Sequence, residues 1–139
     1  MAAVPDVKTT GLEGKDPASV ARQLGEQFAA RAAHFDDSDE FVAENYAALR
    51  AAGLVEAGVP KEFDGGGHDV AALSEMLREL AHHCSSTALA FAMHTHQVAI
   101  PAWRWVHQKA APVEPLLKRI AAERIILLSS GGSDWIAGS

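Results

Sequence analysis

This 139-residue chain has little cysteine, few aromatic residues and a shortage of positive charge. Its single cysteine, Cys84, cannot form an intramolecular disulfide, which excludes a disulfide-stapled secreted scaffold and favours a reducing, cytoplasmic setting. Lysine and arginine total 12 against 18 acidic residues, giving a formal net charge of −6. This balance argues against nucleic acids and anionic membranes as partners.

The sequence also shows neither a secretory signal nor a membrane-spanning segment. Residues 1–16 contain no apolar core of the kind that a secretory signal needs, so we expect a loose tail there. The longest apolar stretch, residues 87–106, is interrupted by residues that a lipid-exposed helix tolerates poorly: His94, His96, Gln97, Pro101 and Arg104. We therefore predict no membrane-spanning helix.

Helix signals dominate what is present. Hydrophobic residues make up 48% of the chain and charged residues 22%, as in an ordinary globular domain. Asp16 is a predicted N-cap with Pro17 at the first helical position. A second helix is predicted to begin at a capping box, Asp37–Glu40, and to end at Gly53, which tolerates a positive φ. Asp69 should cap a third helix, whose buried stripe is Leu73, Met76, Leu77 and Leu80.

The fourth predicted helix is the most apolar. It should begin at residues 85–87, run to about His107 and kink at Pro101. Because residues 88–93 are apolar on every face, we expect other helices to surround this helix.

The end of the chain changes character. Pro112 and Pro115 open a short fifth helix, and the apolar run Ile125–Leu128 then predicts a β-strand. No later segment could pair with that strand. The predicted fold class is therefore all-α, a bundle of about five helices ending in one orphan strand.

Few residues suggest chemistry on their own. The three glycines at 65–67 do not follow a strand and lack the GxxxxGK pattern, so a phosphate-binding loop is disfavoured. Neither His82 with His83 nor His94 with His96 has the i, i+4 spacing of a helical metal site, so we assign no metal and expect surface or singly hydrogen-bonded histidines. Cys84 is interpreted as a buried thiol.

Three stretches, in their order, carry a family resemblance: "NYAALRAAGLVEAGVPKEFDGGGHD", "EMLRELAHHCSSTALAFAMHTHQVAIP" and "ERIILLSSGGSDW". Over residues 17–135 the chain resembles the N-terminal part of an acyl-CoA dehydrogenase. The resemblance implies a helical domain at 17–123 after a tail at 1–16, and at 124–139 the start of a truncated middle β-domain. It also implies an FAD-dependent enzyme that removes two hydrogens from the α and β carbons of an acyl-CoA thioester.

The resemblance further implies roles for particular residues. Ser129 and Ser130 stand near the family's Thr-Glu-Pro turn, which is absent here, and would face the flavin; Ser133, in Gly-Ser-Asp, would contact the CoA moiety. One side of the fourth helix would line the acyl pocket, and we predict that it carries Ala88, Leu89, Ala92 and His96 together. The small alanines would leave room for a bulky or long acyl group.

No catalytic residue is assigned. In most members of the family the base is a glutamate of a C-terminal bundle that this sequence does not contain, and Glu114 and Glu123 offer no substitute. The resemblance implies that the chain alone is inactive and that the full enzyme forms a homo-oligomer, a dimer or a tetramer. Its electron acceptor is not indicated.

Two alternatives stay open. A flavin-dependent monooxygenase of the same superfamily can also lack the Thr-Glu-Pro turn, and His94 or His96 near a flavin would suit peroxyflavin chemistry. A non-enzymatic helical binding module belongs to a different class. Such a module should be a monomer without an exposed apolar surface, whereas a domain of a larger enzyme should expose the surface that other domains cover.

Overall fold

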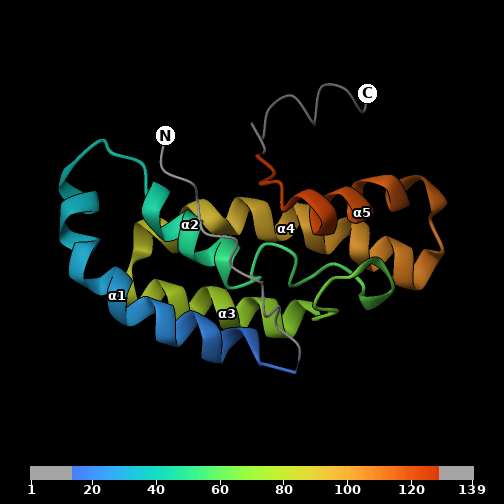
Figure 1. The fold of residues 1–139 in the computed structure, drawn as a ribbon, viewed down its shortest axis with the longest axis horizontal. Coiled ribbons are helices and arrows are strands. Elements are labelled where there is room, and N and C mark those ends of the chain that lie inside the picture. The colour runs from blue at the N-terminus through green and yellow to red at the C-terminus, as the bar shows by residue number, and fades with distance from the viewer. Residues whose placement is uncertain (1–13, 129–139) are drawn as a thin grey trace, which may run out of the picture.

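The computed structural model describes residues 14–128, and within them the chain is an all-α bundle, as predicted (Figure 1). Helices α1 and α3 lie side by side, α4 runs along α3, α2 lies over the first half of α4, and α5 lies against its second half. The elements are α1 Pro17–Asp37, α2 Ala43–Ala51, η1 Lys61–Phe63, α3 Val70–His83, α4 Ser85–Gln108, η2 Ala111–Val113 and α5 Glu114–Glu123, where η marks a 3₁₀ turn.

Most helix ends follow the predicted chemistry. The Asp16 carboxylate accepts a hydrogen bond from the Ser19 N–H at 3.0 Å, and Asp69 accepts one from the Ala72 N–H at 2.9 Å. Each aspartate thereby satisfies a backbone donor that the first helical turn leaves without a partner. Gly53 follows α2 with a φ of 79°, the left-handed conformation expected of a C-terminal glycine.

The start of α2 differs from the prediction. The capping box expected at Asp37–Glu40 is wrong, because α1 continues through Asp37 and α2 begins only at Ala43, after Val42, with no side-chain cap. Apolar packing sets this boundary instead. The Phe41 ring lies 5.0 Å from the Tyr46 ring, and these residues hold the two positions of a hydrophobic staple around the helix start.

Helix α4 has the predicted extent but not the predicted surroundings. It carries Pro101 inside its span and continues to Gln108. One face is buried and includes Phe91, whereas the Leu89 side chain is 74% exposed. The expectation that helices surround residues 88–93 was therefore wrong for the part of the chain that the structure describes. Composition alone does not reveal which apolar face has a partner.

The predicted strand is not seen. Among residues 14–128 there is no β-strand, and residues 124–128 have no regular secondary structure. A strand needs a ladder partner for its backbone groups, and the described residues supply none. The segment is held by other bonds: the Leu127 N–H donates to His94 at 3.0 Å, and the Arg124 side chain pairs with Glu56 at 3.0 Å.

An irregular segment lies in the core. Residues 54–60, here called the buried loop, are all buried although none belongs to a helix or strand. Buried backbone carbonyls without partners are costly, so each needs a donor. The Leu54 carbonyl accepts from the Ala57 N–H at 3.4 Å, and the Glu56 carbonyl accepts from the Val59 N–H at 3.0 Å. These two bonds leave further carbonyls to be satisfied from elsewhere.

The glycine turn, Gly65–Gly67, supplies three further donors. Each glycine gives its N–H to a carbonyl of the buried loop; the pairs are Gly65 with Pro60, Gly66 with Glu56 and Gly67 with Val59, at 3.3, 3.0 and 2.8 Å. Such close backbone approach leaves no room for side chains. A Cβ on Gly65 would lie 2.1 Å from the Val59 carbonyl oxygen. Because these N–H groups are engaged within the chain, they do not form a phosphate cradle.

A buried polar chain ties the other side of the bundle together. Arg31 of α1 donates to the Asn45 side-chain oxygen of α2 at 2.6 Å, and Asn45 donates to the Thr87 hydroxyl of α4 at 2.8 Å. Thr87 donates in turn to the Cys84 sulfur at 3.1 Å. Cys84 is buried, as predicted. Three helices therefore share one polar network, in which the Arg31 Nε atom is left without a hydrogen-bond partner.

The glycine turn generates a stability prediction. Gly65→Ala should lower the free energy of unfolding by about 2 kcal/mol or more, because its Cβ meets fixed backbone. Gly58→Ala is the matched control: its Cβ would lie 2.9 Å from a methyl group of Leu73, which can rotate away. Urea unfolding monitored by circular dichroism measures both. An equal or smaller loss for Gly65→Ala would contradict the proposed packing.

Candidate functional site

The outer face of α4 carries a continuous stripe of large side chains. The outer stripe consists of Leu89, Met93, His96, Ile100 and Trp103, which follow one another at alternating steps of four and three residues and so share one side of the helix. Leu89 is 74%, Ile100 57% and Trp103 49% exposed. Within residues 14–128 nothing covers this face. Contiguous exposed apolar surface of this kind marks a binding or packing site.

The residues predicted to line an acyl pocket do not all lie on this stripe. Leu89 and His96 are exposed, Ala92 is half-buried, and Ala88 is only 7% exposed and belongs to the core cluster. All four still fall within about 100° around the helix axis, with Ala88 at the buried edge of the group, and their role in an acyl pocket stays a prediction. The small Ala88 side chain packs inward between helices, directly behind the exposed positions.

His96 is the polar group of the outer stripe. Its Nδ1 lies 3.2 Å from the Ala92 carbonyl oxygen one turn earlier, and its Nε2 lies 3.2 Å from the Gln97 side-chain nitrogen. A carbonyl only accepts and an amide nitrogen only donates, so this geometry assigns the proton to Nδ1 and leaves Nε2 as an acceptor. Both ring nitrogens are therefore engaged by neighbours on the same helix at the exposed surface of α4.

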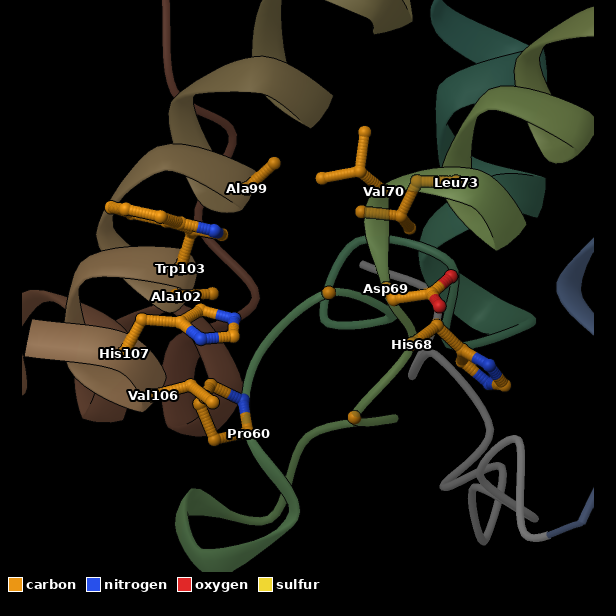
Figure 2. Close-up of a pocket in the computed structure, with 12 residues that line it drawn as sticks. Pro60, His68, Asp69, Val70, Leu73, Ala99, Ala102, Trp103, Val106 and His107 are labelled. Atoms are coloured by element: carbon orange, nitrogen blue, oxygen red, sulfur yellow. The ribbon is translucent and has the colours of Figure 1, made fainter.

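A cavity lies beside the stripe and was not predicted from the sequence. It has a volume of about 200 Å³ and lies between the start of α3, the buried loop and the second half of α4 (Figure 2). Trp103, Ala99 and Val106 reach it from α4, opposite Pro60 and Val70. The glycines just before the cap of α3 were a usable signal, because they allow that turn to approach the buried loop, which lines the cavity.

Two histidines border this cavity. Burial lowers the pKa of His68 below its ordinary value, while Asp16 opposes the shift and Lys61 adds to it. The neutral ring is therefore the favoured form of His68 at neutral pH. His107 lies against Trp103, with ring centroids 5.0 Å apart. The cavity is thus an apolar hollow bordered by two histidines and the side chain of Asp69.

His94 lies on the opposite side of α4 and is buried. Its exposed fraction is 1%, and both ring nitrogens have partners: Nε2 lies 2.9 Å from the Val55 carbonyl and Nδ1 accepts from the Leu127 N–H at 3.0 Å. The sequence indicated a surface or singly hydrogen-bonded histidine, which was wrong. The opposite placement of His94 and His96 around the helix was predicted correctly.

The other residues with predicted roles do not add a reactive group to the site within the described part of the chain. Residues 14–128 hold no cluster of three or more potential metal ligands. Trp105 packs on Phe63 and donates its ring N–H to Glu62, which is a packing role. Ser129, Ser130 and Ser133 lie outside the described residues. None of the helices in the described part has the length and apolarity needed to span a membrane.

The outer stripe can bind, but it holds no acid or base of the carboxyl type. Helix α4 contains one charged residue, Arg104, and no aspartate or glutamate. On α5, Glu114 pairs with Lys118 and Glu123 with Arg119 in ordinary i, i+4 surface pairs. The arrangement therefore offers an apolar wall with one imidazole, suited to an apolar ligand.

Comparison with models of known protein families yields a match. Residues 17–118 match the family model described as "Acyl-CoA dehydrogenase, N-terminal domain". This range begins with α1 and ends within α5, so it includes the outer stripe, the cavity and the buried loop. A search among curated proteins finds no match.

The exposed stripe predicts binding of a hydrophobic dye. Ile100→Glu should sharply reduce the fluorescence enhancement of anilinonaphthalene sulfonate, because it places a charge in the middle of the apolar surface. Its free energy of unfolding should change by only about 0.5 kcal/mol, since the site is exposed. Leu116→Glu on α5, where Leu116 is 38% exposed, is the control. Equal losses of dye signal in both variants would show that the stripe is not the binding surface.

Proposed function

The chain belongs to the acyl-CoA dehydrogenase family through its N-terminal domain, and on this premise we propose that it forms one wall of the acyl pocket of an FAD-dependent oxidoreductase. The proposed reaction is the removal of two hydrogens from the α and β carbons of an acyl-CoA thioester. The observation that carries the proposal is the uncovered apolar stripe on α4.

The stripe has the properties that an acyl chain needs. Burying a methylene group contributes about 0.8 kcal/mol, so affinity for a long acyl chain depends on extended apolar surface. From Leu89 to Trp103 the stripe spans 14 helical steps, or about 21 Å at 1.5 Å per residue. Its lack of carboxylates favours an uncharged ligand. His96 adds one polar point that can orient the chain or a group attached to it.

The described residues do not by themselves fit FAD. The glycine-turn N–H groups are engaged with the buried loop, and the cavity of about 200 Å³ is smaller than the pockets of roughly 300 to 1,000 Å³ that hold drug-sized ligands. Ser129 and Ser130, which the family resemblance places at the flavin, are not among the described residues. The role proposed for residues 14–128 is therefore to bind the acyl group and exclude water from it.

A monooxygenase of the same superfamily is the second candidate, and His96 is the observation that favours it. Its ring is exposed on the stripe and, within the described residues, bonds only to groups of α4, whereas the His94 ring is buried and engaged inside the core. The open stripe argues against an independent binding module, which would be expected to cover its own apolar surface.

One prediction of the proposed function concerns the cofactor. The 139-residue chain alone should not bind FAD at micromolar concentration, because its described residues lack a preformed dinucleotide pocket. Quenching of FAD fluorescence during titration with the protein measures this. Saturable binding at one FAD per chain would contradict the proposal that these residues bind the acyl group but do not by themselves hold FAD.

The second prediction concerns acyl chain length in the flavin-loaded enzyme that contains this domain. Ala92→Phe should reduce kcat/KM for long acyl-CoA substrates on the order of tenfold more than for short ones, because the added ring occupies space that only long chains fill. Ala99→Phe is the control, since Ala99 lines the cavity rather than the outer stripe. Length-dependent losses in Ala99→Phe but not in Ala92→Phe would place the acyl chain in the cavity instead.

A further inference from the structure

Two polar contacts fasten residues 124–128 to the core at the same short stretch of the buried loop. Arg124, which follows α5 with a φ of 50°, pairs through Nε with the Glu56 carboxylate at 3.0 Å. Three residues later, the Leu127 N–H donates to His94, whose other nitrogen bonds to Val55, the neighbour of Glu56. The Arg124–Glu56 contact is an ion pair between side chains. The contact between Leu127 and His94 depends on the protonation state of the buried imidazole ring.

We propose that His94, in its neutral Nε2–H form, is a positioning residue that sets the backbone of residues 124–128 against the buried loop and α4. The partners leave only this tautomer: the Val55 carbonyl requires a donor, and the Leu127 N–H requires an acceptor. One imidazole therefore satisfies a core carbonyl and fixes the segment that follows α5. No other side chain in the described part of the chain bonds to the Leu127 N–H.

This role has a consequence that rests on the proposed function. The anchored residues 124–128 directly precede Ser129, which the family resemblance assigns to the flavin. The outer stripe and the anchor stand on opposite sides of α4. A single helix thus carries both the proposed wall of the acyl pocket and the anchor of the segment that precedes the proposed flavin contact.

Protonation should break the anchor. A charged imidazole carries a hydrogen on Nδ1, which would then face the Leu127 N–H, and two donors cannot form a hydrogen bond. Burial lowers the pKa of His94 below its ordinary value, and the hydrogen bond to the Val55 carbonyl opposes the shift. The stabilisation is therefore complete above the unfolded-state pKa of about 6.5 and is lost as the pH falls through the lower folded-state pKa.

The charged and titratable neighbours of this site are few. On the elements that pack against His94, they are Glu56 beside Val55, Arg124 before Leu127, and Tyr46, whose ring meets Phe91 edge-on. Glu56 and Arg124 pair with each other. The α3 residues that pack near the ring, Leu73 and Met76, are apolar. The pH response of the anchor is thus assigned to His94 itself.

Two conservative substitutions separate the two bonds. The asparagine amide oxygen occupies nearly the place of the histidine Nδ1, whereas the glutamine amide reaches the place of Nε2. His94→Asn should therefore keep an acceptor for Leu127 and abolish its dependence on pH. His94→Gln should keep a donor for Val55 and release the Leu127 amide.

The test follows the Leu127 amide in nitrogen-15 NMR spectra of the whole chain. In His94→Gln we expect an upfield amide-proton shift and hydrogen exchange roughly 3- to 10-fold faster, the effect of losing one net hydrogen bond. In the wild type the same upfield shift should appear as the pH falls through the folded-state pKa of His94, which lies below its ordinary value, and exchange should quicken relative to its intrinsic pH dependence. In His94→Asn neither change should appear. The ring nitrogens of wild-type His94 should show an unprotonated Nδ1 at neutral pH.

Two control variants test whether the pH response belongs to His94. His96→Asn, two residues away on the exposed face, should leave the Leu127 amide and its pH response unchanged, and Glu56→Gln should leave the pH response in place. A Leu127 amide that is the same in His94→Gln and wild type, or a pH response that persists in His94→Asn, would overturn the proposal. Because these measurements need neither FAD nor acyl-CoA, they can fail while the proposed function holds, and the reverse is equally possible.

Discussion

The buried loop is the constraint on which the rest of this fold depends. Seven consecutive residues lie in the core without a helix or strand to pair their carbonyls, so donors from outside the segment must supplement the two bonds made within it. Gly65–Gly67 provide three such donors and His94 provides another. The glycine turn is therefore a fixed structural element, although three consecutive glycines suggest a flexible backbone.

Helix α4 links the core to the candidate site because its two faces have different partners. The inner face carries Phe91 and His94 into the bundle, while Thr87 joins the network that extends to Arg31. These contacts hold the helix rigidly, so the outer stripe is presented on a fixed scaffold. A binding wall built in this way is more precise than one on a loop, because the packing of one face fixes the rotation of the other.

The polar groups of the interior are mostly neutral and paired. Asn45 with Thr87, and His94 with its two backbone partners, satisfy one another at little electrostatic cost. The buried ion pair between Glu56 and Arg124 is the contrasting case, since one Glu56 oxygen is left without a hydrogen-bond partner. Interiors of this kind favour one arrangement of the chain because each polar group fits only one set of neighbours.

Many helix ends of this protein could be predicted from the sequence because they depend on local interactions. Asp16, Asp69 and Gly53 act on residues within one helical turn, so their roles do not depend on the remainder of the fold. The order of motifs also sufficed to identify the family. Sequence reasoning failed where long-range partners decide: the start of α2 is set by Phe41 on Tyr46, and the exposure of Leu89 depends on which helices reach α4. Only the tertiary structure brings Val55, His94 and Leu127 together. His94 is 39 positions from Val55 and 33 positions from Leu127, and hydrogen bonds over such separations produce no periodic pattern in the sequence.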